Sequence, residues 1–316
     1  MATQRRGWAR YEGWGWIWGG DDEVGALNHM TAETVLEALQ RVRRGIIYDL
    51  GAPLDRESFL WPGHVGTEII AFRTPEGIKR ERDLSPMGDR PEGISYHTSL
   101  IMLSDHAGAQ LDGLSHATTG LDNHWYNGFT VSEHGSDFGP RKAGAENIPP
   151  IIAPAVLIDV AGYLGVEELE PSQPISSREL EDTLKAQESQ VEPGDVVMVR
   201  TGTMRHWSEG GHAVEALSNA DSAGITLEAA RWLVEDQGAM LVGGDTSTLE
   251  VVPAVDGESL APVHEYLLID QGVHMGELHN LEGLARDSVY EFTYIALCPP
   301  VKGTTAGFAL RPIAIV

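Results

Sequence analysis

The sequence lacks several residues and motifs that identify common classes of protein. It holds a single cysteine, Cys298, among 316 residues, which excludes an intrachain disulfide and fits a reducing compartment. Cys298 ends an apolar run, which favours a core residue over a nucleophile. No Gly-x-Ser-x-Gly motif occurs, which argues against a serine hydrolase of the Ser-His-Asp type. No apolar run approaches the roughly 20 residues that a membrane span requires.

Basic residues are also scarce. The chain has 22 lysines and arginines against 47 acidic residues, giving a formal net charge of −25. Nucleic acids and anionic membranes would repel such a chain, so we expect a small-molecule substrate, with no nucleic acid and no membrane as partner. The first residues include two arginines with no apolar stretch after them. We therefore expect no secretory signal and a cytoplasmic protein.

The sequence does contain alternating strand and helix patterns. Apolar spacing predicts an amphipathic helix over residues 31–44. A capping box at Ser176, a threonine cap at Thr226 and Pro262 each predict the start of another helix, the last ending at Gly272. Apolar runs predict strands at 46–50, 69–72, 100–103, 155–160, 196–200 and 239–242, with a polar loop over 73–93. This alternation favours an α/β fold with a mixed central sheet.

The N-terminal segment is unusually rich in tryptophan, with four among the first thirty residues: Trp8, Trp14, Trp16 and Trp18. Such a segment either packs against a partner subunit, covers a substrate site or joins the core. No composition shift or low-complexity linker divides the rest of the chain. We therefore expect a Trp-rich arm over residues 1–30 and a single catalytic domain over residues 31–316.

The densest polar cluster is the stretch HAGAQLDGLSH at residues 106–116. An extended chain would point its four even-numbered polar side chains to one side: His106, Gln110, Asp112 and His116. Gly108 and Gly113 would let the backbone turn or pass close beside them. The apolar run at 100–103 predicts a buried strand that delivers this cluster from a rigid element.

Imidazole nitrogens beside a carboxylate suit zinc or manganese. Because the cluster contains no thiol, an open catalytic site with a divalent metal is favoured over a closed structural site. His264 and Glu277 could complete the ligand set, although each also fits an ordinary helix or loop position. The alternative is that every polar residue of the cluster is separately satisfied in the core or a loop.

A loop over residues 120–128 follows the cluster and contains Trp125 and Tyr126. Flat aromatic side chains beside a metal site suit contacts to a ring-shaped substrate. An ordinary surface loop is the competing interpretation.

The sequence resembles the cyclase-like family of metal-dependent hydrolases, which includes arylformamidases (kynurenine formamidases), isatin hydrolase and relatives of trans-dienelactone hydrolase. The resemblance extends over nearly the whole chain and includes WGGDDEVGALN at 18–28, the stretch at 106–116, GDTS at 244–247 and PVKGTTAGFALRP at 300–312. It implies a swivelling β/β/α cyclase-like fold. It also implies a homodimer or homotetramer, in which the Trp-rich arm could pack across an interface.

Family members commonly carry His-x-Gly-Thr-His-x-Asp-x-Pro-x-His, and this chain differs from that pattern at Ala109, Gln110 and Leu114. The resemblance includes a longer, Trp-rich branch in which Gln occupies the second His position. A carboxamide oxygen is a weaker zinc ligand than imidazole, so one metal ion is expected rather than two.

The same resemblance implies a role for each residue of the site. His116 would be the general acid/base, and the metal ligands would come from the remaining set: His106, Gln110, Asp112, His264 and Glu277. A metal-activated water would then open a lactone or a cyclic amide. An arylformamidase acting on amides of the N-formylkynurenine type is the alternative within the class, and a non-catalytic metal- or ligand-binding protein is the alternative of another class.

Overall fold

The computed structural model describes residues 13–84, 92–207, 217, 222–257 and 259–316. Within these residues the main element is a nine-stranded mixed sheet. Its strands, in spatial order, are β1 (Ile47–Asp49), β13 (Ile313–Ile315), β11 (Glu291–Ala296), β5 (Ile151–Asp159), β7 (Val196–Arg200), β9 (Leu241–Gly244), β10 (His274–Glu277), β4 (Gln110–Asp112) and β12 (Ala306–Gly307). The four strands from β5 to β10 run parallel, and the others pair antiparallel. This confirms the predicted α/β fold with a mixed central sheet.

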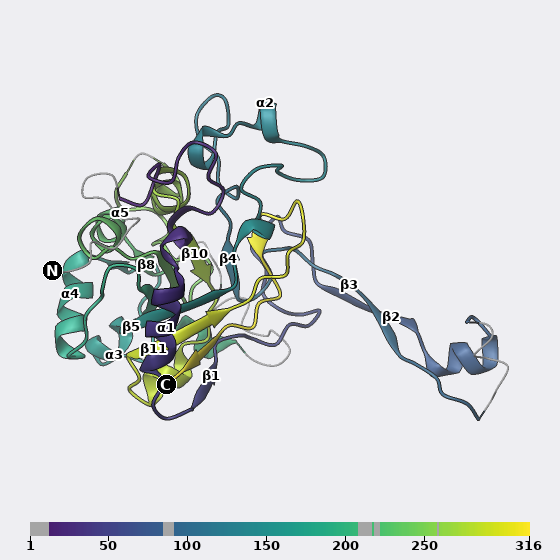
Figure 1. Ribbon diagram of the computed structural model, residues 1–316. Helices are drawn as coiled ribbons and strands as arrows, with labels where there is room; N and C mark the ends of the chain where they lie inside the picture. The colour runs from purple at the N-terminus through teal and green to yellow at the C-terminus, as the bar shows by residue number, and fades with distance from the viewer. Residues whose placement is uncertain (1–12, 85–91, 208–216, 218–221, 258) are drawn as a thin grey trace.

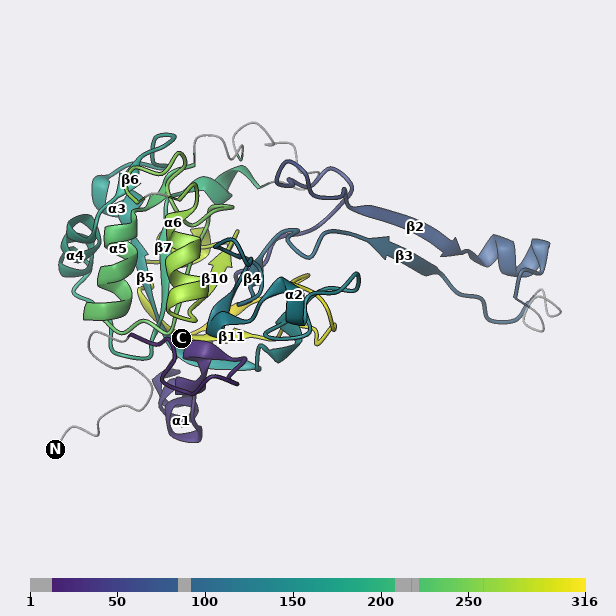
Figure 2. The ribbon, with the colours of Figure 1, turned by 90° about the horizontal axis from the view of Figure 1, so that it is seen from above.

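The parallel strands form the centre of the hydrophobic core. Strand β7 is buried at every position and β5 at all but one, as expected for apolar strands covered on both faces. Helices α4 (Ser177–Ala186), α5 (Leu227–Arg231) and α6 (Pro262–His264) stand together along one side of the sheet in Figure 2. Two predicted caps are confirmed, because the side chains of Ser176 and Thr226 accept hydrogen bonds from the first turns of α4 and α5.

Helix α1 (Ala32–Arg41) is shorter than predicted. It begins after its cap, Thr31, but ends three residues before the expected boundary because Val42 adopts an extended conformation. Within α1 only Ala38 is fully buried. Its backbone carbonyl accepts a 2.6 Å hydrogen bond from the hydroxyl of Thr293 on β11. This contact fixes the helix on the sheet.

The N-terminal tryptophans have different environments. Trp14 is fully buried and stacks on Trp18 at a ring-centroid distance of 5.7 Å, whereas Trp16 is 56% exposed. Trp8 lies outside the described residues. Trp14 therefore packs in the core, which is one of the three roles considered for this segment.

The prediction of a buried strand at residues 100–103 is wrong. Strand β3 (Thr98–Met102) pairs only with β2 (Glu68–Arg73) in a two-stranded hairpin, and all five of its residues are exposed. Figures 1 and 2 show this hairpin projecting far from the body of the molecule. An apolar run identifies a strand, but it does not reveal what covers that strand.

The remaining elements are short. They include α2 (Val131–His134), α3 (Val160–Leu164), α7 (Glu282–Arg286) and the parallel pair β6 (Pro174–Ile175) and β8 (Gly224–Ile225). The last turn of α6 continues as a wider helical segment, Glu265–Asp270, close to the predicted end at Gly272. None of the described helices is both long enough and apolar enough to cross a lipid bilayer.

Candidate metal centre

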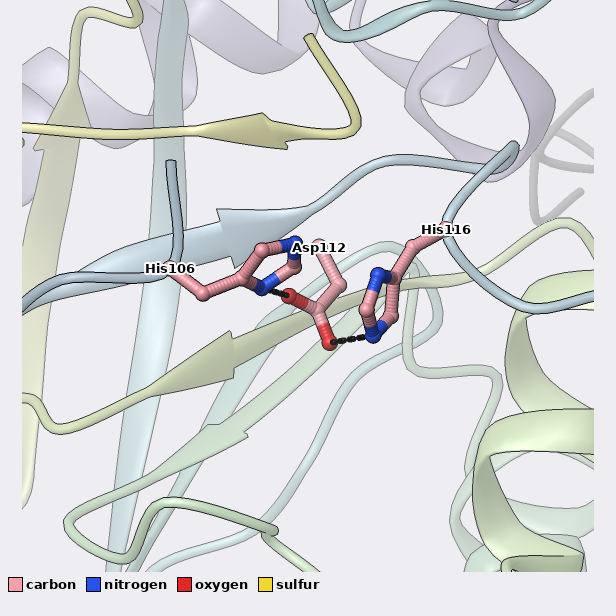
Figure 3. A group of neighbouring side chains, drawn as sticks. All are labelled: His106, Asp112 and His116. Carbon is pink, nitrogen blue, oxygen red and sulfur yellow. Dashed lines mark ion pairs between the residues drawn. The ribbon is translucent and has the colours of Figure 1, made fainter. Parts of the chain in front are cut away.

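The predicted cluster assembles around one carboxylate, that of Asp112 on β4 (Figure 3). His106 Nδ1 lies 3.2 Å from Asp112 Oδ1, and His116 Nε2 lies 4.0 Å from Asp112 Oδ2. From α6, His264 Nε2 lies 3.7 Å from the same Oδ2. The structure therefore brings three imidazoles from two distant segments to a single buried acid.

Strand β10 supplies the second carboxylate of the site. Glu277 is the register partner of Gln110 in the antiparallel pairing of β10 with β4. Its Oε1 lies 3.5 Å from His264 Nε2, and its Oε2 accepts a 2.8 Å hydrogen bond from Gln110 Nε2. All five predicted ligands thus meet at this edge of the sheet, with His116 beside them.

The alternation of side chains along an extended chain accounts for only part of this convergence. Only residues 110–112 form a strand, whereas His106 and His116 reach the site from turns on either side. Gly108 has φ +67°, which permits the first turn. At Gly113 an added Cβ would lie 2.7 Å from the carbonyl oxygen of Thr305, so the absence of a side chain lets the neighbouring segment approach, as predicted.

The buried oxygens of the site fit a divalent cation. Both carboxylate oxygens of Asp112 and the carboxamide oxygen of Gln110 are buried without a hydrogen-bond partner, an arrangement that is costly unless another group compensates them. In two overlapping trios all ligand atoms lie within 4.8 Å of one another: His106, Asp112 and His116, and Asp112, His264 and Glu277. Imidazole nitrogens and carboxylate oxygens are a donor set suited to zinc or manganese.

Three further residues hold the histidines in orientation, and none of them was predicted from the sequence. Glu250 forms a hydrogen bond with His264 Nδ1, which leaves His264 Nε2 facing the site. Thr305 Oγ1 lies 3.1 Å from His106 Nε2 and itself donates to Asp105. Carboxylates and hydroxyls commonly orient metal-bound histidines in this way. Thr305 lies in the quoted C-terminal motif, but no local pattern marks Glu250.

Burial and charge shift the ionisation of the site in opposite directions. Burial lowers the pKa of His116 to about 4, in spite of the opposing attraction of Asp112. Burial raises the pKa of Glu277 to about 7, and the charge of Asp112 raises it further. Burial also acts to raise the pKa of Asp112, but His116 and His106 outweigh it and hold that pKa well below its usual range. Asp112 therefore remains an anion, and His116 is a neutral proton acceptor at pH 7.

A cavity of about 130 Å³ opens over the cluster. It is lined by Phe59, Trp61, His64, His106, Gln110, His116, Ser247, His264, Glu277 and Leu278. His64 is a further residue of the site that was not predicted from the sequence. Its Nδ1 is buried without a hydrogen-bond partner, and its ring centroid lies 5.3 Å from that of His106.

The predicted substrate contacts, Trp125 and Tyr126, do not line this cavity. Both side chains lie in the core, where Tyr126 donates to Asp22 and Trp125 donates to the carbonyl of Lys142. Aromatic side chains do face the site, but they are Phe59 and Trp61 from the segment before β2. Tyr126 therefore packs against the N-terminal segment, and Trp125 packs within the core.

The fold and the site together define an α/β protein with a buried histidine and carboxylate centre for a divalent metal. The Cyclase family model, described as "Putative cyclase", matches residues 48–251. The chain belongs to this family, as its sequence resemblance implied.

Solved structures agree with this assignment. One described as a novel cyclase is 28% identical, with a TM-score of 0.81 over 95% of this chain and 96% of that chain. Isatin hydrolase A from Labrenzia aggregata, bound to benzyl benzoate, is 19% identical, with a TM-score of 0.61 over 90% and 98% of the two chains. A predicted metal-dependent hydrolase from Bacillus stearothermophilus is 15% identical, with a TM-score of 0.52 over 86% and 98%. The latter two share the fold. Among curated proteins, none matches the chain.

Proposed function

We propose that this protein is a metal-dependent hydrolase that opens a lactone or a cyclic amide. The observation that carries the proposal is the buried Asp112, whose two oxygens have no hydrogen-bond partner while three imidazoles surround it. A buried anion in this setting is costly unless a cation compensates it. Similarity to proteins named as isatin hydrolase and as metal-dependent hydrolases supports the same class.

The ligands of the ion would be His106, Asp112, His264 and Glu277, with Gln110 as a weaker oxygen donor. When bound, zinc or manganese polarises a carbonyl and makes water acidic enough to attack near neutral pH. His116 takes a proton from the attacking water and returns it to the leaving nitrogen or oxygen as the C–N or C–O bond breaks. Because its pKa is about 4, His116 is neutral at pH 7 and has a free nitrogen to accept this proton.

Two alternatives remain as outcomes of the test. An arylformamidase would hydrolyse N-formyl aryl amines and would use the same residues. A metal- or ligand-binding protein would bind the ion without turnover. The presence of His116 in the cavity wall, with its ring centroid 4.1 Å from that of His106, favours an enzyme.

The decisive experiment measures metal content and hydrolysis together. The purified protein is assayed on lactones, cyclic amides and N-formyl aryl amines, before and after chelation and after zinc or manganese is restored. We expect turnover that is lost on chelation, and a His116→Ala variant that keeps its metal but loses about 10²- to 10⁴-fold in kcat. Turnover that resists chelators, or full activity of His116→Ala, would overturn the mechanism, whereas bound metal without turnover would favour the binding protein.

A further inference from the structure

One imidazole in the cavity wall is neither a proposed ligand nor the proton acceptor. His106 and His264 belong to the proposed ligand set and His116 accepts the proton, whereas His64 lines the same cavity without either role. Its Nδ1 is buried and has no hydrogen-bond partner. A buried polar nitrogen in this state is costly unless a partner reaches it. The cavity is where such a partner would enter.

A tight turn just before β2 places His64 at the site. Its backbone N–H donates a 3.1 Å hydrogen bond to the carbonyl of Trp61 and closes a four-residue turn. Pro62 at the second position and Gly63 at the third, with φ +102°, fit a type II turn. Gly63 and Val65 on either side of His64 are exposed, whereas His64 is partly buried. The turn therefore directs this one side chain inward.

The cavity over the cluster is too small to hold a whole drug-sized molecule. Its volume of about 130 Å³ equals that of about four water molecules at about 30 Å³ each. It therefore receives the reacting group of a substrate, and an oxygen of that group lies close to the walls. The rings of His64 and His116 both neighbour that of His106, at centroid distances of 5.3 Å and 4.1 Å. The unpartnered nitrogen and the proton acceptor thus belong to one group of neighbouring rings.

Other donors in the cavity wall are already engaged. Gln110 Nε2 donates to Glu277, and His264 Nδ1 is bonded to Glu250. Among the described residues that line the cavity there is no lysine or arginine, so no long cationic side chain stabilises an anion there. An imidazole donates from Nδ1 as the imidazolium and as the neutral tautomer with its proton on that nitrogen. Donation by His64 therefore requires no change in its charge.

Hydrolysis of a lactone or a cyclic amide places negative charge on one oxygen. The oxygen of water bonds to the carbonyl carbon, the electron pair of the C=O double bond moves to the carbonyl oxygen, and His116 takes a proton from the water. When the C=O double bond forms again, the C–O or C–N bond breaks and the proton on His116 passes to the leaving atom. A donor fixed beside the carbonyl oxygen stabilises the transition state more than the substrate.

We infer that His64 is a catalytic residue whose Nδ1–H donates a hydrogen bond to the oxygen of the reacting carbonyl. The inference rests on the proposed function and adds a residue to it. His64 keeps its proton throughout the reaction, so its role differs from that of His116. The hydrogen bond strengthens as the carbonyl oxygen becomes an anion, and it therefore acts on kcat.

Three substitutions of His64 test which of its atoms matters. His64→Phe keeps a ring and removes both nitrogens. The side-chain nitrogen of asparagine is as many bonds from the backbone as Nδ1, whereas that of glutamine is as many as Nε2. On the best substrate of the panel, we expect His64→Phe to lose about 10²- to 10³-fold in kcat with KM nearly unchanged. His64→Asn should retain about tenfold more kcat than His64→Gln.

Metal content and a control variant accompany these assays. All three variants should hold as much zinc or manganese as the wild type. The matched control is His134→Phe, which changes another partly buried imidazole, on α2 and outside this cavity, and should keep the wild-type kcat. Loss of metal from His64→Phe would make His64 a ligand, and a raised KM at unchanged kcat would make it a ground-state contact. Either result contradicts the inference, as does equal kcat in His64→Asn and His64→Gln, a comparison that holds even if His64→Phe does not fold.

A binding experiment separates this inference from the proposed function. Calorimetry on the metal-loaded protein uses methyl phenylphosphonate, a stable tetrahedral anion that resembles the charge distribution after water has added. We expect His64→Phe to bind it about 10- to 100-fold more weakly than the wild type, with His64→Asn between the two. Equal affinities, or no binding by the wild type, would count against the inference even if lactones are hydrolysed. Weaker binding by His64→Phe in a protein that turns over no substrate would preserve the oxyanion contact and reject the proposed hydrolase.

Discussion

The positioning role of Glu250 leads to a sharp prediction, because the change can be made almost without altering shape. Glu250→Gln keeps an oxygen that can accept from His264 Nδ1 but removes the negative charge. It also leaves the backbone N–H of Val263 without its present acceptor, Glu250 Oε2. Hydrogen bonds to charged groups contribute about 1.5–3 kcal/mol, and loss of a partner that orients a metal-bound histidine weakens metal binding by about 10- to 100-fold.

The expected loss of zinc affinity in Glu250→Gln is therefore about 10- to 100-fold, or about 1.4–2.7 kcal/mol. Competition with a chromophoric chelator at pH 7 measures it directly. Glu235→Gln is the matched control, because Glu235 accepts a 2.8 Å hydrogen bond from Tyr266 and its loss changes the net charge equally. A lower zinc affinity in Glu250→Gln than in Glu235→Gln would therefore come from the contact with His264 and not from the change in net charge.

Wild-type zinc affinity in a folded Glu250→Gln protein would refute the reasoning. Circular dichroism and thermal unfolding establish that the variant is folded. If it is not, Thr305→Val tests the same principle at the other histidine, because Thr305 Oγ1 is the group that contacts His106 Nε2. Its affinity should fall by a similar factor.

Three further predictions concern groups outside the ligand set. Arg200→Met should lower the free energy of unfolding in urea by about 3–5 kcal/mol, because Arg200 pairs at 2.8 Å with the buried Asp159, which would be left uncompensated. An unchanged midpoint would contradict this. Burial raises the pKa of Asp245 from 3.8 to about 6, so the unfolded state releases its proton first as pH rises. Relative to Asp245→Asn, the free energy of unfolding of the wild type should fall by about 2.4 kcal/mol between pH 4 and pH 7, and parallel stability curves would count against it. Burial raises the pKa of Cys298 to about 12, so alkylation by iodoacetamide at pH 8 should be about 10³-fold slower than in urea, and equal rates would show an accessible thiolate.

The sequence determined the local chemistry of this protein. Apolar runs located four of the nine strands of the central sheet, β1, β5, β7 and β9, and β7 at residues 196–200 coincides with its prediction. The caps at Ser176 and Thr226 followed from hydrogen bonds over three residues, which sequence spacing specifies. The density of imidazole and carboxylate between His106 and His116 pointed to the candidate metal centre for the same reason, since neighbours in sequence are forced to be near in space.

Only the tertiary structure decided which distant groups meet. Glu250 reaches His264 across 14 residues, and Thr305 contacts His106 across 199 residues, so no local pattern could specify either pair. The exposure of β3 and the burial of Trp125 reversed the sequence expectations. Hydrophobicity and aromatic content describe what a segment can bury, whereas the packing of the whole chain decides whether it is covered and which side chains face the site.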